Sequence, residues 1–293
     1  MNQPPDGGDP SLTGGVVVGV DGSSSSQHAL QWAHTYCSHR LLPLTALMAW
    51  NGDSDLPPVD GNDRAPSPNA AMQSFAESFV IETLGESHGV TCKVIADEPR
   101  AALVQASDAA SLVVVGARGL GGFRGLLLGS VSRHLLNTAR CPVAVVRRID
   151  REQAGPVIVG VDGSEPALRA LRWASQHAIV EKRALIAVYA WQIPIMPATN
   201  SFVLVSTLDR LRADAPDILA RALTRAELAE GVDDIEQCVV EGGAASALLT
   251  VADQRRASLL VVGARSKGRF GALLGSVSAQ VAQHAPCPVV VIP

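Results

Sequence analysis

Short apolar runs alternate with amphipathic stretches along this chain. The run Val16–Val20 is rich in β-branched residues and has no polar interruption, which is typical of a strand buried on both faces. From Ser26 to about His39, apolar residues recur at helical spacing. The same order of strand and helix continues to the end of the chain. It predicts an α/β fold in which a parallel sheet has helices on both faces.

The pattern predicts corresponding elements in both halves of the chain. In the first half, strands are expected at Val16–Val20, Leu44–Trp50, Val90–Ala96, Leu112–Val115 and Pro142–Val146, helices at about Ser26–His39, Ala71–His88, Pro99–Ala110 and Ser130–Ala139, and a loop at Asn51–Asn69. In the second half, strands are expected at Val157–Val161, Leu185–Trp191, Glu236–Glu241, Leu259–Val262 and Val289–Ile292, with helices starting at Glu165 and Ser276, further helices at Leu208–Leu228 and Ala245–Gln254, and a loop that runs through Val205.

Three sequence blocks occur twice in the same order. They are Gly-Val-Asp-Gly-Ser at 19–23 and 160–164, Leu-Leu-Gly-Ser-Val-Ser at 127–132 and 273–278, and Cys-Pro-Val at 141–143 and 287–289. A repeat of about 140 residues has the size of an independently folding domain. We therefore predict a disordered tail at 1–14, a first domain at 15–147, a linker at 148–155 and a second domain at 156–293.

The composition narrows the class of protein. Hydrophobic residues make up 47% of the chain, enough for a core in each half, and the formal net charge is −4 without a basic run. Nucleic acid is therefore not expected as a partner. The apolar runs are shorter than the roughly 20 residues of a membrane span, and no secretion signal is visible, so a cytoplasmic protein is expected. The five cysteines include no CxxC pair, which favours reduced and mostly buried thiols over a disulfide framework.

Two segments with candidate chemistry follow strands that should end at the same edge of the sheet. Asp21 comes directly after the first strand, and the glycine-rich segment 116–130 follows the fourth. Glycines permit positive φ and let main-chain N–H groups approach an anion, and the start of the helix at Ser130 favours phosphate. Asp21 would accept a hydrogen bond from a ribose hydroxyl or help to hold a metal. The alternative is a surface loop with no ligand.

The spacing Gly116-x2-Gly119-x9-Gly129-Ser130, together with the Gly-Val-Asp-Gly-Ser and Cys-Pro-Val blocks, resembles the ATP-binding branch of the universal stress protein family. The duplication is similar to that of its tandem-domain members. The resemblance implies two Rossmann-like domains, related to adenine nucleotide alpha hydrolases, with five parallel strands each. It implies ATP with Mg²⁺ between Asp21 and the glycine loop, and adenine near Ala49 and Ala190. It also implies that the last strands of the two halves pair as an intramolecular pseudo-dimer, and it allows a homodimer of whole chains.

These arguments predict nucleotide-binding residues in both halves. They are Asp21, Gly22, Ser23, Ala49, Gly116, Arg118, Gly119, Gly129, Ser130 and Val131 in the first half, and Asp162, Ala190, Gly263, Arg265, Gly268, Gly275, Ser276 and Val277 in the second. The second loop is one residue shorter and carries Ser266 where the first has Gly119. If this position needs positive φ, serine costs on the order of 1–3 kcal/mol, unless Gly268 shifts the register and restores the loop. We therefore predict tighter binding in the first half.

No catalytic residue is predicted, because neither half supplies a matched general base or the charged residues of a dedicated phosphoryl-transfer site. The favoured function is an ATP-dependent switch or sensor in the stress response that acts on an unidentified protein. Two alternatives remain: a slow ATP hydrolase, and a structural pseudo-dimer with a vestigial nucleotide site.

Overall fold

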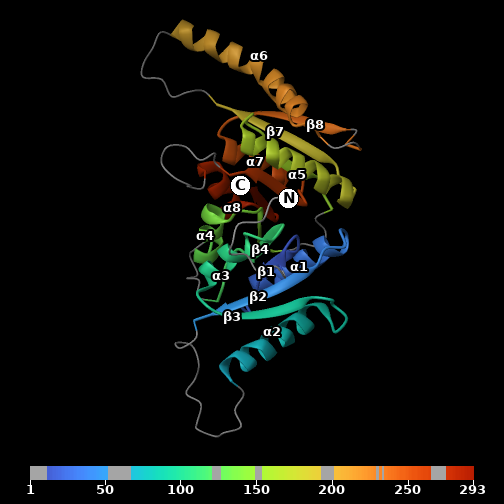
Figure 1. Cartoon of the computed structure of the whole chain (residues 1–293). Coiled ribbons are helices and arrows are strands. Elements are labelled where there is room, and N and C mark those ends of the chain that lie inside the picture. The colour runs from blue at the N-terminus through green and yellow to red at the C-terminus, as the bar shows by residue number, and fades with distance from the viewer. Residues whose placement is uncertain are drawn as a thin grey trace, which may run out of the picture. The chain divides into compact units, whose positions relative to one another are not determined.

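The computed structural model describes residues 12–51, 67–120, 127–148, 154–192, 201–228, 231–232, 234–264 and 275–293. The chain divides into two compact units, Met1–Ile149 and Asp150–Pro293, each built on five parallel strands (Figure 1). The predicted α/β class with two tandem Rossmann-like domains is thereby confirmed. The finer boundaries of tail and linker stay a prediction, as does the pairing of the two last strands.

In the first unit the strands lie side by side in the order β3-β2-β1-β4-β5. Their bounds are β1 Val16–Gly19, β2 Leu44–Trp50, β3 Thr91–Ala96, β4 Leu112–Gly116 and β5 Val143–Val146. The helices are α1 Ser24–Ser38, α2 Pro68–Leu84, α3 Pro99–Ala106 and α4 Ser130–Thr138. At the centre, Val17 of β1 pairs with Thr45 on one side and Val113 on the other. The chain therefore turns in opposite directions after β1 and after β4, and a crevice opens between their carboxyl ends.

The second unit repeats this arrangement with the strand order β8-β7-β6-β9-β10. Its strands are β6 Val157–Gly160, β7 Leu185–Trp191, β8 Ile235–Glu241, β9 Leu259–Gly263 and β10 Val289–Ile292. Its helices are α5 Glu165–Glu181, α6 Ser201–Arg225, α7 Ala244–Gln254 and α8 Ser276–His284. Ile158 pairs with Ile186 and Leu260, as Val17 pairs with its neighbours in the first unit.

The helices cover both faces of each sheet. In the first unit α1 and α2 pack beside each other on one face, and α3 and α4 pack beside each other on the opposite face (Figure 1). The central strands β1 and β4 are buried apart from their last residues. The edge strands β3 and β8 are partly exposed and carry polar residues. The continuous apolar pattern thus belongs to the central strands, which have helices on both sides.

Most differences between the predicted and observed elements lie at helix ends. The helix α2 begins at Pro68, inside the predicted loop, because Ser67 caps it, and it ends at Leu84 because Gly85 adopts a φ of 89°. Its predicted end at His88 was wrong. The helix α3 ends at Ala106 instead of Ala110, and α6 spans Ser201–Arg225 with Pro216 inside it. The predicted loop through Val205 was therefore too long.

Candidate functional site

The first unit contains a cavity of about 590 Å³ at the carboxyl ends of β1, β2 and β4. This volume lies within the range of roughly 300–1,000 Å³ that is usual for small-molecule sites. Eight of the ten residues predicted for this half line the cavity, namely Asp21, Ala49, Gly116, Arg118, Gly119, Gly129, Ser130 and Val131. The other two, Gly22 and Ser23, lie in the turn between β1 and α1, outside the lining.

One wall of the cavity is apolar. Leu47 and Ala49 come from β2, Val115 from β4, and Pro99 and Leu103 from α3. The sequence prediction missed Pro99 and Leu103, because an apolar helical residue looks the same whether it packs on the sheet or borders a cavity. The wall offers an aromatic base a surface of aliphatic side chains.

Asp21 joins the end of β1 to the glycine loop. Its Oδ1 accepts a hydrogen bond from the main-chain N–H of Ser23 at 3.0 Å, and its Oδ2 accepts one from the main-chain N–H of Leu120 at 3.1 Å. Each carboxylate oxygen can accept a further bond. In this structure the side chain therefore organises main chain at the rim of the cavity.

The loop glycines provide space and do not provide unusual backbone angles. Gly116, Gly119 and Gly129 do not have positive φ, which corrects the sequence expectation. A Cβ at Gly116 would lie 2.7 Å from the main-chain carbon of Ser25, so this glycine lets α1 approach the end of β4. Positive φ occurs instead at Gly22, at 83°, in the turn that follows Asp21. The predicted strain at Ser266, which lies outside the described residues, therefore loses its premise, because its counterpart Gly119 does not have positive φ.

Serine hydroxyls hold the start of the loop. The Ser25 Oγ accepts from the N–H of Arg118 at 3.2 Å, and the Ser132 Oγ donates to the carbonyl of Gly116 at 2.7 Å. The Gly129 N–H donates to the carbonyl of Ala117 at 2.7 Å, which closes the loop at the start of α4. These contacts hold the two ends of the loop, residues 116–120 and 127–130, which the structure describes.

The N-terminus of α4 lines the cavity with main-chain N–H groups that no described side chain caps. Its N-cap is Gly129, and no side chain in the described part of the chain caps its first turn, whereas Ser23 caps α1. Ser130, Val131 and Ser132 line the cavity at this point. Uncapped N–H groups and the helix dipole favour an anion here.

Positive charge lies near the same end of the cavity. Arg118 lines the cavity and is exposed, and Arg147 follows directly after β5. Burial lowers the pKa of Arg147, and the nearby charge of Arg118 lowers this pKa further. An anion in the cavity would be attracted by the positive charge of Arg118.

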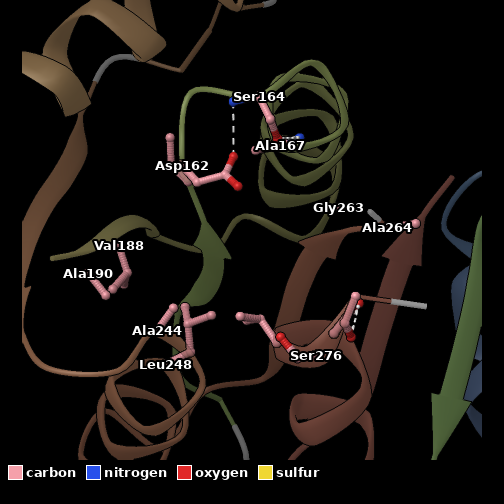
Figure 2. Close-up of a pocket in the computed structure, with 14 residues that line it drawn as sticks. Asp162, Ser164, Ala167, Val188, Ala190, Ala244, Leu248, Gly263, Ala264 and Ser276 are labelled. Atoms are coloured by element: carbon pink, nitrogen blue, oxygen red, sulfur yellow. Dashed lines mark hydrogen bonds between the residues drawn. The ribbon is translucent and has the colours of Figure 1, made fainter. Parts of the chain in front are cut away.

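The second unit contains a corresponding but smaller cavity of about 280 Å³. Figure 2 shows Asp162 after β6 across from Ser276 at the start of α8, with Ala190 and Leu248 at the side. The predicted residues that line it are Asp162, Ala190, Gly263, Gly275, Ser276 and Val277, while Arg265 and Gly268 lie outside the described residues. The N-cap of α8 is Gly275, again without a side-chain cap in the described residues.

The contacts around the second cavity differ from those around the first. The Oδ1 of Asp162 accepts the N–H of Ser164 at 2.9 Å, as Asp21 accepts that of Ser23. Pro166 stands where the first unit has Ser25, so the hydroxyl that accepts the loop N–H in the first unit has no counterpart. Ser278 donates to the carbonyl of Gly275, within its own helical turn, and does not repeat the Ser132 contact.

Two further observations bear on ligands. Within the described ranges, no three acidic, histidine or cysteine side chains come together as a metal site. In the same ranges, no helix combines the length and the apolarity needed to cross a membrane. All five cysteines are free thiols, and Cys37, Cys141 and Cys287 are buried.

Comparison with known proteins agrees with this architecture. The model of the universal stress protein family matches residues 14–147 and again residues 154–293. A universal stress protein from Mycolicibacterium smegmatis is 32% identical over 95% of this chain and 96% of its own length. One from Mycobacterium tuberculosis is 32% identical over 94% of this chain and 96% of its own length. The crystal structure of a universal stress protein from Archaeoglobus fulgidus matches with a TM-score of 0.65 and 21% identity, over 94% of this chain and 97% of that one.

Proposed function

The chain belongs to the universal stress protein family, and we propose that it is a cytoplasmic regulatory protein that binds ATP with Mg²⁺ in its first unit. One observation supports this proposal above the others. The cavity of about 590 Å³ has an apolar wall at one side and the uncapped N-terminus of α4 at another. A nucleotide has the same division between a flat base and an anionic phosphate chain.

In the proposed complex the base lies against Leu47, Ala49 and Leu103, where apolar surface is removed from water. The phosphates lie toward the N–H groups of Ser130 and Val131, for which the described part of the chain supplies no side-chain cap. The positive charge of Arg118 adds to this attraction. In the proposed complex, Mg²⁺ would be held mainly by phosphate oxygens and water, as is usual for this ion with nucleotides.

The hydrogen bonds of Asp21 at the cavity favour a regulatory role over dedicated hydrolysis. Among the described lining residues, Asp21 is the only carboxylate, and both of its oxygens already accept main-chain N–H groups. These two main-chain hydrogen bonds fix the orientation of the carboxylate, whereas a general base must be oriented toward the proton of an attacking water. We therefore expect slow turnover, with nucleotide occupancy changing the surface that a regulated protein recognises.

We propose weaker binding in the second unit. Its cavity is about 280 Å³, and Pro166 replaces the hydroxyl that holds the first loop. The smaller volume and the lost contact both reduce what the site can offer a triphosphate.

Calorimetry on nucleotide-stripped protein tests the proposal. Wild type is titrated with MgATP beside Ala49→Leu and the matched Ala190→Leu, which narrow the two cavities separately. We expect Ala49→Leu to abolish the tighter binding and Ala190→Leu to leave it in place. If the Ala49→Leu variant still binds MgATP tightly, the nucleotide does not bind in the first cavity.

Two further measurements separate the alternatives. A single-turnover assay in which bound ATP stays intact for many minutes supports the switch, whereas rapid release of phosphate supports a hydrolase. If MgATP neither binds nor raises the melting temperature, the site is vestigial and the structural role is favoured.

A further inference from the structure

The Asp21 carboxylate connects two segments that are far apart in the sequence. Its Oδ1 holds the N–H of Ser23 in the turn after β1, and its Oδ2 holds the N–H of Leu120, 99 residues further along the chain. Leu120 is the last described residue before the middle of the glycine loop, and its side chain is 73% exposed. Since little apolar packing holds this exposed residue, the hydrogen bond to Asp21 is a main restraint on the start of the loop.

Gly119 fits this arrangement closely. A Cβ at this position would lie 2.4 Å from Oδ2 of Asp21, far inside van der Waals contact. A carboxylate bound on both oxygens cannot turn away without losing one of its two hydrogen bonds. The φ of Gly119 is not positive, so backbone conformation alone would accept another residue. The glycine is therefore required by the carboxylate beside it.

We propose that Asp21 is a positioning residue that clasps the start of the glycine loop before the nucleotide arrives, and that Gly119 is the residue that permits this clasp. The inference rests on the proposed function and deepens it. A loop already held in place loses less conformational freedom on binding, and this raises affinity without any new contact to the ligand.

The clasp also gives the inequality of the two units a physical basis. In the sequence, Ser266 stands where the first unit has Gly119, and Ser266 lies outside the described residues. A side chain placed where the Cβ of Gly119 would be collides with an Asp21-type carboxylate, so a glycine is expected wherever this contact forms. Asp162 keeps the bond to the turn, through the N–H of Ser164. The clasp is therefore proposed for the first unit, where both of its hydrogen bonds are described.

The first test needs no nucleotide. Amide hydrogen exchange is measured on the ligand-free full chain for wild type, Asp21→Asn, Asp21→Ala and the control Asp162→Ala. We expect exchange at Leu120 to accelerate by about tenfold or more in Asp21→Ala, because a hydrogen bond to a charged acceptor is lost. Asp21→Asn keeps the shape and one carbonyl acceptor and should show an intermediate effect. Asp162→Ala should leave Leu120 unchanged. Equal exchange at Leu120 in wild type and Asp21→Ala would overturn the clasp.

The second test is a double-mutant cycle on MgATP affinity with Gly119→Ala, Asp21→Ala and the combined variant. We expect Gly119→Ala to weaken binding by about tenfold in the wild-type background and to have little further effect once Asp21 is alanine. Additive losses would contradict the proposal. Denaturation curves for all variants confirm that each is folded.

The two tests keep the clasp apart from the proposed function. A wild-type protein that does not bind MgATP overturns the proposed function, and the Leu120 exchange then decides on the clasp alone. If wild type binds MgATP but the exchange rate at Leu120 is the same with and without the Asp21 carboxylate, the clasp is overturned. The proposed function is then unaffected.

Discussion

Replacing Gly129 with aspartate should change the stability of α4 and the affinity for ATP in opposite directions. Gly129 is the N-cap of α4, with φ −70° and ψ 163°, angles that an aspartate adopts without strain. A Cβ there would meet the carbonyl oxygen of Ala117 at 3.4 Å and the Cα of Arg118 at 3.5 Å, which are ordinary van der Waals contacts. Its carboxylate would cap the N–H groups that we assign to phosphate.

The two effects have opposite signs. Asparagine, serine or aspartate in place of a glycine cap adds a few tenths of a kcal/mol, and a negative charge at the helix N-terminus adds about 0.3–1 kcal/mol. We therefore expect the first unit to gain about 0.5–1 kcal/mol. Two like charges about 4 Å apart repel by roughly 1 kcal/mol in water and 4 kcal/mol near a protein surface. ATP affinity should fall by about 5-fold to 1,000-fold.

The assay pairs chemical denaturation with calorimetric titration of MgATP for Gly129→Asp, Gly129→Asn and the matched Gly275→Asp. The asparagine variant caps the helix without charge and should lose less affinity than the aspartate variant. Gly275→Asp should leave the tighter binding unchanged. If Gly129→Asp binds MgATP as well as wild type, the phosphates do not lie at the start of α4.

Further predictions concern packing, strain and pH. Gly116→Ala should destabilise the first unit by about 1–3 kcal/mol in urea denaturation, because the new Cβ would lie 2.7 Å from main-chain atoms of Ser25; an unchanged midpoint would contradict this packing argument. Leu41→Gly should stabilise the fold by about 1 kcal/mol in the same assay, since Leu41 is 93% exposed and has a φ of 53°, which disfavours a side chain; a loss of stability would show that the side chain is needed. Burial raises the thiol pKa of Cys37, Cys141 and Cys287 from 9.0 to about 12, so these thiols stay neutral in the folded state. The contribution of the neutral thiols to the free energy of unfolding is therefore complete below pH 9 and falls as the pH rises toward 12. Denaturation midpoints at pH 7 to 10 check this, and a stability that rises above pH 9 would refute it.

The sequence predicted the strands better than the helix ends. Strands β2 and β7 appear at their predicted bounds because short, mostly apolar runs have few stable alternatives to a strand covered by helices. The ends of α2 depended on Ser67 and on which of two glycines, Gly85 or Gly89, closed the helix. Which residue ends a helix depends on the hydrogen bonds that form at that end, and these cannot be read from the pattern of hydrophobic residues.

The chain's own sequence determined the duplication, the fold class and the segments that carry the candidate site, because repeats, buried strands and glycine-rich turns are written in residue order. The tertiary structure decided why those glycines are there. It brought Ser25 against Gly116 and Asp21 against Gly119, so that absent side chains, and not positive φ, explain the motif. Contacts between residues about a hundred positions apart depend on how the strands are ordered in the sheet, and only the folded chain reveals that order.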